Sequence, residues 1–282
     1  MDQSKIPCDN PTMSEPIDQP LSRVYIDTVK RIVTNYAYLG LDGSLEDFNA
    51  LRHYDVSRSR WNVDPISRPL TLLTNDQLDL IQNIVIDLDV RGVPGDYIEA
   101  GIWRGGVIVF LRALLKAHGI PNRKVFGADS FAGIPRNALF RHDPVDNWAD
   151  RWVASLGEVT MNIARMGFLD DQTVLVPGYF ADSLPALETE CFSLIRLDCD
   201  AFDSVTESLN YLYPRLSQGG IVIIDDWHLV PCQLAVGLYR DHHGIDATIK
   251  VQAGNAYWIK QQELGEPGPE SANHDWLARA KN

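Results

Sequence analysis

Cysteine is scarce in this 282-residue chain, which has four such residues and no C-x-x-C pair. Secreted domains that depend on disulfide bonds have dense, regular cysteine patterns, whereas sparse thiols suit a reducing compartment. We therefore expect a cytoplasmic protein without a disulfide framework. The scattered thiols are Cys8, Cys191, Cys199 and Cys232.

Long apolar runs and an excess of positive charge are also missing. No apolar run approaches the roughly 20 residues of a membrane-spanning helix, and residues 1–20 lack the apolar segment of a signal peptide. The 38 acidic and 25 basic side chains give a net charge of −13. Because nucleic-acid binding needs a basic surface, we expect neither nucleic acid nor membrane as a partner, and a small-molecule substrate instead.

The best-defined pattern is the stretch 193–228, which reads SLIRLDCDAFDSVTESLNYLYPRLSQGGIVIIDDWH. One apolar run ends in Asp198-Cys199-Asp200, apolar residues then recur at helical spacing, and a second apolar run ends in Asp225-Asp226. This order predicts a strand, a crossover helix stopped by Gly219-Gly220, and a second parallel strand. Both acidic pairs are then expected at the carboxyl ends of strands, where open α/β sheets bind ligands.

Four carboxylates at one sheet edge repel one another unless a cation or protons neutralise them. Oxygen ligands select hard ions such as Mg2+ or Ca2+ over zinc. The sequence therefore predicts a metal site at this edge. The alternative is that some of these aspartates are helix caps and solvated turn residues.

Further elements are predicted around this unit. Residues 133–168 lack strand character, so we expect an insertion, largely helical, over the carboxyl edge. Five strands alternating with helices and then a hairpin predict a mostly parallel, seven-stranded Rossmann-like α/β sheet with helices on both faces. The patterns indicate helices over 21–39, 76–91, 105–118 and 233–243, with Asp76 as the N-cap of the second. Strands are indicated over 96–101, 124–129 and 173–176, followed by a loop over 177–185. A hairpin is indicated by 247–251 and 256–260 around Gly254-Asn255.

These patterns also divide the chain. We expect a mobile arm over 1–20, a helical N-terminal and lid segment over 21–92, the main α/β domain over 93–262 and a loose tail over 263–282. The helix over 21–39 packs on the main domain or on another subunit, which leaves a homo-oligomer open. An arginine cluster either steers an anionic group or forms a solvated loop face. Its members are Arg52, Arg58, Arg60 and Arg68.

The first strand of the main domain leads into a glycine turn, EAGIWRGG at 99–106. Glycines there let a ligand approach the backbone closely. The spacing is not GxGxxG, and Glu99 would repel the pyrophosphate of a dinucleotide but suits a cationic ligand, such as a sulfonium with an ammonium group. Asp129, at the end of the next strand, is placed to accept hydrogen bonds from two ribose hydroxyls. A plain structural turn is the alternative.

With these residues the chain resembles the class I S-adenosylmethionine methyltransferases. Within them it is similar to the macrocin O-methyltransferase (TylF-type) family, which are metal-dependent sugar O-methyltransferases of antibiotic biosynthesis. The resemblance runs from about Thr71 to Lys260. The segments that carry it are EAGIWRGG (99–106), ADSFAGIP (128–135), LDDQ (169–172), PGYFADSLP (177–185), LDCDAFDS (197–204), YPRLSQGGIVIIDDW (213–227) and AYWIK (256–260).

The resemblance implies a methyltransferase domain in 93–262 with S-adenosylmethionine and Mg2+ as cofactors. It makes Thr71-Leu72 part of a lid over the cofactor, Asp200 the general base, and Asp198, Asp225 and Asp226 the metal ligands. The other residues implied to bind the cofactor are Glu99, Ala100, Gly101, Ile102 and Trp103 at the methionine end, Asp129, Ser130 and Phe131 at the ribose, Asp171 and Gln172 near the adenine, and Phe180 and Asp198 along the pocket.

The chain departs from the family pattern at three places. Residues 237–240, Gly-Leu-Tyr-Arg, lack an acid that the family often has, Trp227-His228 replaces a tyrosine after the Asp pair, and Phe202 replaces another tyrosine. These changes concern the identity of the substrate more than the chemistry.

The expected reaction is methyl transfer to a hydroxyl of a small-molecule diol, with a sugar of a glycosylated natural product favoured. Mg2+ would chelate two neighbouring hydroxyls and Asp200 would take the proton. His228 is an alternative base, better matched to neutral pH. A catechol-type aromatic O-methyltransferase, a dinucleotide or nucleotide-sugar enzyme, and a non-catalytic cofactor-binding protein remain open.

Overall fold

A computed structural model describes residues 19–35, 69–147 and 152–261 of the chain. The predicted arm before residue 19, the arginine cluster at 52–68 and the tail after residue 261 lie outside the described residues. The last two residues of the predicted arm open the first helix, α1 (Gln19–Val33). The predicted helix over 21–39 is therefore described only as far as its end at Val33 and the turn that follows.

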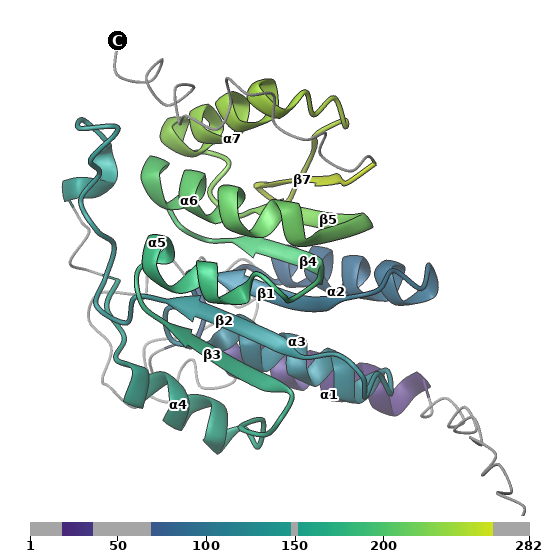
Figure 1. The fold of residues 1–282 in the computed structure, drawn as a ribbon. Coiled ribbons are helices and arrows are strands. Elements are labelled where there is room, and N and C mark those ends of the chain that lie inside the picture. Colours follow the sequence, from purple (N-terminus) through teal and green to yellow (C-terminus); the bar gives the residue numbers. More distant parts are fainter. Residues whose placement is uncertain (1–18, 36–68, 148–151, 262–282) are drawn as a thin grey trace, which may run out of the picture.

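Seven strands form one sheet in the order β3-β2-β1-β4-β5-β7-β6 (Figure 1). The strands β1 to β5 run parallel, and β7 and β6 are added antiparallel at one edge. This confirms the predicted fold class, including the C-terminal antiparallel pair. The strands are β1 (Asp96–Ala100), β2 (Val125–Asp129), β3 (Thr173–Pro177), β4 (Phe192–Leu197), β5 (Leu216–Ile224), β6 (Lys250–Gln252) and β7 (Asn255–Ile259).

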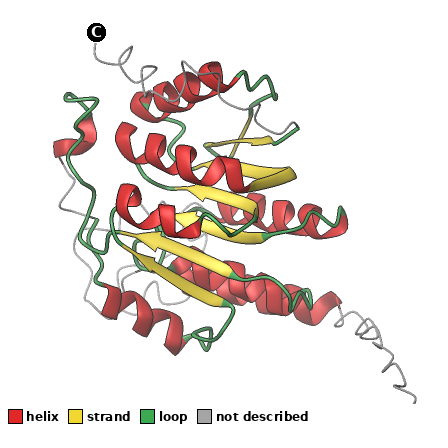
Figure 2. Ribbon diagram, in the orientation of Figure 1, coloured by secondary structure: helices red, strands yellow, loops and turns green. Residues whose placement is uncertain are grey.

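Helices cover both faces of the sheet because successive strand residues point to opposite sides and both sides are apolar (Figure 2). In β5, Ile221 and Ile223 join the core under α1 to α4, while Val222 and Ile224 join the core under α5 to α7. None of the helices in the described ranges has the length and apolar content that a membrane crossing requires. The remaining helices are α2 (Asn75–Val90), α3 (Gly106–Ala117), α4 (Leu156–Arg165), α5 (Phe180–Ser183), α6 (Phe202–Leu212) and α7 (Val230–His243), with 3-10 turns η4 (Pro144–Asn147), η6 (Leu184–Leu187) and η7 (Tyr213–Arg215).

The end of the crossover helix differs from the prediction. Helix α6 stops at Leu212 and passes into η7, which contains Pro214. Proline has no N–H to continue the helical ladder. Gly219 and Gly220 lie inside β5 instead, where a Cβ on Gly220 would come within 2.6 Å of the Leu216 side chain. These glycines permit the irregular start of β5 rather than stopping the helix.

Two other local predictions are corrected. The N-cap of α2 is Thr74 and not Asp76, because Thr74 has extended backbone angles and its hydroxyl accepts the N–H of Gln77. Asp76 lies in the first helical turn, where its charge suits the helix dipole. The hairpin turn lies at Ala253-Gly254, both with positive φ, one residue earlier than predicted.

The insertion over 133–168 is less helical than predicted, because only η4 and α4 interrupt irregular backbone in its described part. It does lie over the carboxyl edge. The carboxylate of Asp143 accepts the backbone N–H of Phe202 at 3.0 Å, and the side chain of Asn137 accepts that of Asp203 at 3.0 Å. Both bonds satisfy free N–H groups at the start of α6, so they tie the insertion to the site below it. The segment 177–185, predicted as a loop, contains α5.

Candidate functional site

A cavity of about 660 Å³ opens at the carboxyl ends of the central strands. The two acidic pairs, Asp198 with Asp200 and Asp225 with Asp226, are predicted at this edge of the sheet. Most predicted site residues line it, drawn from segments far apart in the sequence. They are Thr71, Leu72, Glu99, Gly101, Ile102, Trp103, Asp129, Ser130, Phe180, Asp198, Asp200, Asp225, Asp226 and His228.

Four predicted cofactor-binding residues do not line the cavity: Ala100, Phe131, Asp171 and Gln172. Ala100 is buried in the core, and Phe131 packs against the core under α1 to α4. The side chain of Gln172 donates to the carbonyls of Pro121 at 2.9 Å and Arg123 at 2.8 Å, which occupies it in holding the start of β2. The structure therefore does not bring the Asp171-Gln172 pair to the rest of the site.

The glycine turn after β1 is held against the neighbouring strand end. Gly101 has φ +89°, and a Cβ there would lie 1.8 Å from the backbone oxygen of Asp198. Position 101 therefore requires glycine, because the backbone of Asp198 lies too close for any side chain. One carboxylate oxygen of Asp129 accepts the N–H groups of Ile102 at 2.9 Å and Trp103 at 3.0 Å. Asp129 fixes the turn in addition to its predicted ribose contact.

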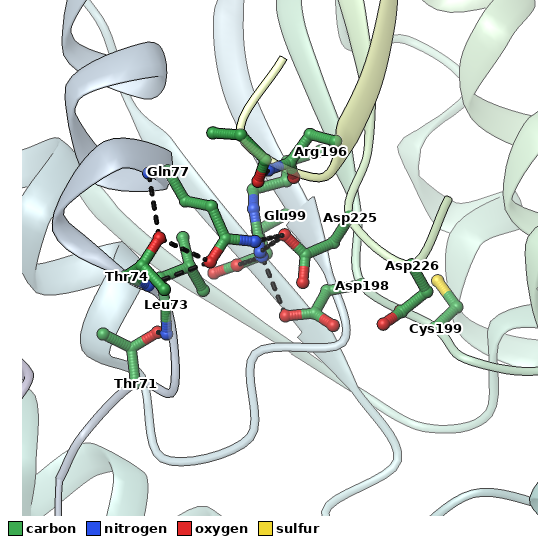
Figure 3. Close-up of polar contacts among 12 residues, drawn as sticks. Thr71, Leu73, Thr74, Gln77, Glu99, Arg196, Asp198, Cys199, Asp225 and Asp226 are labelled. Atoms are coloured by element: carbon green, nitrogen blue, oxygen red, sulfur yellow. Dashed lines mark hydrogen bonds and ion pairs between the residues drawn. The ribbon is translucent and has the colours of Figure 1, made fainter. Parts of the chain in front are cut away.

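A buried cation, Arg196, contacts several of the acidic residues at the strand ends (Figure 3). Its guanidinium pairs with Glu99, with Asp198 at 2.9 Å and with Asp225 at 2.6 Å. The sheet explains this meeting, since Arg196 is the register partner of Glu99 on β1 and of Ile223 on β5, two residues before Asp225. Residues two apart on a strand share a face. The surrounding carboxylates raise the pKa of Arg196 well above its ordinary value despite its burial.

Glu99 keeps one oxygen without a partner. Oε1 pairs with Arg196, whereas Oε2 is buried and has no hydrogen-bond partner within the described residues. Burial raises the pKa of Glu99 to about 8, although the charge of Arg196 opposes the shift. A buried, unsatisfied acceptor at a cavity wall is costly unless a ligand supplies the donor. The arrangement can accept a hydrogen bond from a cationic group.

Three carboxylates, those of Asp198, Asp200 and Asp226, form a compact group that we call the acidic cluster. Each offers an oxygen, and these oxygens lie within 4.8 Å of one another. Burial raises the pKa of Asp200 to about 7 and that of Asp226 well above its ordinary value, and neighbouring carboxylates add to both shifts. Such a group is neutralised by protons or by a cation, and oxygen-only donors suit a hard divalent ion.

Asp200 is held in an unusual backbone conformation. Its φ is +58°, which is uncommon for a residue with a side chain. Its N–H points to Oδ2 of Asp226 at 3.3 Å, and its carbonyl accepts the thiol of Cys232 at 3.1 Å. Trp103 and Phe131 near the same cavity also have positive φ. Strained positions of this kind concentrate where a site must be held in shape.

Asp225 stands apart from the acidic cluster. Its Oδ1 forms an ion pair with Arg196 at 2.6 Å and accepts a hydrogen bond from the side-chain amide of Gln77 at 3.3 Å (Figure 3). Burial raises the pKa of Asp225 to about 6, and Arg196 opposes that shift. The other oxygen, Oδ2, forms no hydrogen bond to any described residue and is free for a ligand. The structure thus brings Asp200, rather than Asp225, into the closest group with Asp198 and Asp226.

His228 lies at the mouth of the cavity and is exposed to solvent. The predicted lid residues Thr71 and Leu72 line the wall formed by the segment before α2. Trp152 lines the cavity too, with its ring edge-on to Trp103 at a centroid distance of 5.9 Å.

Sequence reasoning missed Arg196 and Gln77. Arg196 had a visible signal, because it is the one charged residue inside the apolar run 194–197 and a buried strand rarely contains an unpaired charge. Gln77 had a weaker one, since Thr74-x-x-Gln77 fits a capping box but nothing in that pattern points to Asp225, 148 positions away.

Comparison with known proteins adds sequence relatives. Residues 45–260 match the family model described as Macrocin-O-methyltransferase (TylF). The chain is 37% identical over 241 residues to the 8-demethyl-8-(2,3-dimethoxy-alpha-L-rhamnosyl)-tetracenomycin-C 4'-O-methyltransferase of Streptomyces olivaceus, covering 83% of this chain and 92% of that protein. It is 35% identical over 244 residues to the mycinamicin III 3''-O-methyltransferase of Micromonospora griseorubida, covering 83% of this chain and 95% of that one.

Solved structures agree on the fold. The O-methyltransferase NovP superposes with a TM-score of 0.74 at 30% identity, covering 86% of this chain and 100% of that chain. The calicheamicin methyltransferase CalS11 superposes with a TM-score of 0.53 at 20% identity, covering 89% of this chain and 98% of that chain. At that identity the second similarity concerns the fold alone.

Proposed function

Because the chain belongs to the macrocin-O-methyltransferase (TylF) family and is an O-methyltransferase, we propose that it transfers the methyl group of S-adenosylmethionine to a sugar hydroxyl of a glycosylated natural product. The observation that carries the proposal is one cavity that holds both the unpartnered oxygen of Glu99 and the acidic cluster. The first suits the cationic cofactor and the second suits a divalent cation with a diol. The relative from Streptomyces olivaceus is named for a rhamnosyl substrate, which favours a sugar over a catechol.

The cofactor would lie along the glycine turn. Oε2 of Glu99 needs a donor, and the ammonium of the methionine moiety supplies one. Gly101 leaves the backbone open to close approach, and Asp129 and Ser130 follow at the next strand end, within reach of a ribose. Thr71 and Leu72 would cover it from the segment before α2. S-adenosylmethionine would supply a methyl group on a sulfonium, a cation that suits a cavity lined by several carboxylates.

The metal-binding residues proposed are Asp198, Asp225 and Asp226. Asp198 and Asp226 belong to the acidic cluster, and Asp225 lines the same cavity with an Oδ2 that forms no hydrogen bond to any described residue. Bound Mg2+ would act as a Lewis acid that lowers the pKa of a coordinated hydroxyl and fixes its orientation.

Asp200 is the proposed proton acceptor. Its carboxylate lies within the same cluster as Asp198 and Asp226, where it would be within reach of a hydroxyl bound to the cation. Asp200 would take the proton of the acceptor hydroxyl, and S-adenosylmethionine would supply the methyl group that the acceptor oxygen receives. The products are the methyl ether and S-adenosylhomocysteine. His228 is exposed at the mouth, which places it less well to exclude water from that transfer.

The test is methyl transfer by the purified protein. The protein is treated with EDTA, then assayed with S-adenosylmethionine against deoxysugar glycosides and catechols, with and without Mg2+, by mass spectrometry of the products. We expect methylated glycoside only when Mg2+ is present. Methylation of catechols alone would overturn the sugar assignment, and full activity after chelation would overturn the metal role.

A further inference from the structure

The segment 69–77, which we call the strap, runs along the cavity wall into the first turn of α2 and is tied to three other parts of the fold. The N–H groups of Leu70 and Thr71 donate to the carbonyl of Val33 at 2.8 and 3.0 Å. The carbonyl of Leu70 accepts the N–H of Gly106 at 3.1 Å, which anchors the strap to the start of α3. The third tie is Gln77, at the far end of the strap.

Gln77 uses both ends of its side-chain amide. Oε1 accepts the N–H of Thr74 at 2.9 Å, which completes the capping box of α2. Nε2 donates to Oδ1 of Asp225 at 3.3 Å (Figure 3). The two partners fix which end is which, because the Thr74 N–H requires an acceptor and the Asp225 carboxylate requires a donor. The cap would be satisfied equally well by a glutamate. The donor to Asp225 is therefore a separate property of glutamine at this position.

We propose that Gln77 is a positioning residue that ties the strap over the cofactor to the metal-binding carboxylate of Asp225. Gln77 and Arg196 together hold Oδ1 of Asp225, which leaves Oδ2 without a hydrogen-bond partner among the described residues and available to the cation. The strap contributes Thr71 and Leu72 to the cofactor wall, so the same hydrogen bond couples cofactor binding to cation binding. The inference rests on the proposed function for the identity of the two ligands.

The key variant is Gln77→Glu. It keeps an acceptor for the capping box but replaces the donor to Asp225 with a second carboxylate. The hydrogen bond is lost and like charges face each other across the same gap. The matched control is Gln82→Glu, which makes the same change on the same helix. The oxygen of Gln82 accepts Lys30 at 2.7 Å and lies away from the cavity, so the added charge there meets a cation.

The measurements are the affinity for S-adenosylhomocysteine by calorimetry, in EDTA and across a Mg2+ series, together with the melting temperature and with kcat and KM. For Gln77→Glu we expect a near-normal melting temperature. The Mg2+ concentration that half-maximally enhances S-adenosylhomocysteine binding should rise by about ten- to a hundredfold, the worth of a hydrogen bond to a charged group. Gln82→Glu should match the wild type. Gln77→Met, which removes both polar ends without adding charge, should also raise the Mg2+ requirement.

The possible results distinguish the role of Gln77 from the proposed methyl transfer. If Gln77→Glu and Gln77→Met keep the wild-type Mg2+ requirement, Gln77 is only a helix cap and the positioning role is wrong. If Gln77→Glu unfolds, Gln77→Met alone decides the matter by the same titration. If the wild type binds S-adenosylhomocysteine but Mg2+ has no influence on that binding, the coupling is overturned while the cofactor assignment stands. If the wild type binds no S-adenosylhomocysteine at all, the proposed function itself fails and this inference falls with it.

Discussion

At the scale of single residues, Arg196 sets the electrostatics of the site. Its side chain is 1% exposed, as is that of its partner Glu99, and Asp198 and Asp225 complete its surroundings. A buried charge pair adds little net stability over an apolar pair, but removing one partner leaves the others uncompensated. The fold therefore depends on Arg196 even though no ligand contact is needed from it.

Replacing Arg196 tests this dependence. Arg196→Met should lower the free energy of unfolding at pH 8 by about 3–5 kcal/mol, because Glu99, Asp198 and Asp225 lose their shared cation and must take up protons or remain as uncompensated charges. Arg91→Ala is the control, since Arg91 pairs with the half-exposed Asp87 and donates to the carbonyl of Gly219 at the protein surface, and its loss should cost about 1 kcal/mol. Urea denaturation measures both. An equal loss in the two variants would show that Arg196 is not a structural counter-ion.

Replacing Asp200 and His228 in turn distinguishes the two candidate general bases. Asp200→Asn should reduce kcat by about 10²–10⁴-fold with little change in the affinity for S-adenosylhomocysteine, because it removes only the proton acceptor. His228→Ala should stay within a few-fold of the wild type, since His228 is exposed at the cavity mouth. Steady-state kinetics with calorimetry for each variant decides between them. Normal turnover of Asp200→Asn beside an inactive His228→Ala would transfer the role to His228.

At the scale of elements, the site depends on how closely the ends of β1 and β4 approach. The parallel ladder continues past both strands, with the N–H of Asp198 bonded to the carbonyl of Ala100 at 2.9 Å and that of Asp225 to Leu197 at 2.9 Å. Each strand end is thereby aligned with the next. The acidic residues meet because the ladder fixes the register, and Gly101 makes the closest of these approaches possible.

Adding one methyl group at Gly101 should disturb this alignment. In Gly101→Ala the new Cβ would lie 1.8 Å from the backbone oxygen of Asp198, so the turn or the end of β4 must move. We expect S-adenosylhomocysteine binding to be lost and the melting temperature to fall. Gly157→Ala in α4 is the matched control, because a Cβ there meets nothing within 4 Å; it should be neutral or stabilising by up to about 1 kcal/mol. Normal binding by Gly101→Ala would contradict the close approach.

At the scale of the whole molecule, the site makes stability depend on pH and on cations. Glu99 and Asp200 have pKa values of about 8 and about 7 in the folded protein, against ordinary values of 4.5 and 3.8. An unfolded chain releases these protons near its ordinary values, while the metal-free folded chain retains them. Between about pH 4 and pH 8 the folded state binds more protons, so its stability falls as the pH rises.

The melting temperature of the EDTA-treated protein should therefore be lower at pH 8 than at pH 5. Mg2+ should raise it more at pH 8, because a cation bound only by the folded state stabilises it and competes with protons for the same oxygens. Differential scanning fluorimetry at both pH values, with and without Mg2+, measures this. A melting temperature that rises from pH 5 to pH 8 without metal would contradict the raised pKa values of the buried carboxylates.

The sequence by itself determined the order of the elements and the chemical type of the site. Periodicity and breakers identify strands and helices because they reflect local backbone preference and one-dimensional burial. The acids at 198, 200, 225 and 226 could be placed at one edge because parallel strands joined by a crossover must end on the same side. The resemblance to a family added further residues that line the cavity, among them Thr71, Leu72 and Phe180.

Only the tertiary structure decided which of these groups touch. Arg196 meets three carboxylates from different strands, and Gln77 reaches Asp225 from a helix 148 positions earlier in the chain. It also separated Asp225 from the acidic cluster and left Asp171 and Gln172 away from the cavity. These outcomes depend on strand register, side-chain direction and the packing of α2 on the sheet. Local sequence patterns do not reveal contacts between distant residues. The interaction energies of such contacts arise only between segments that folding has already brought together.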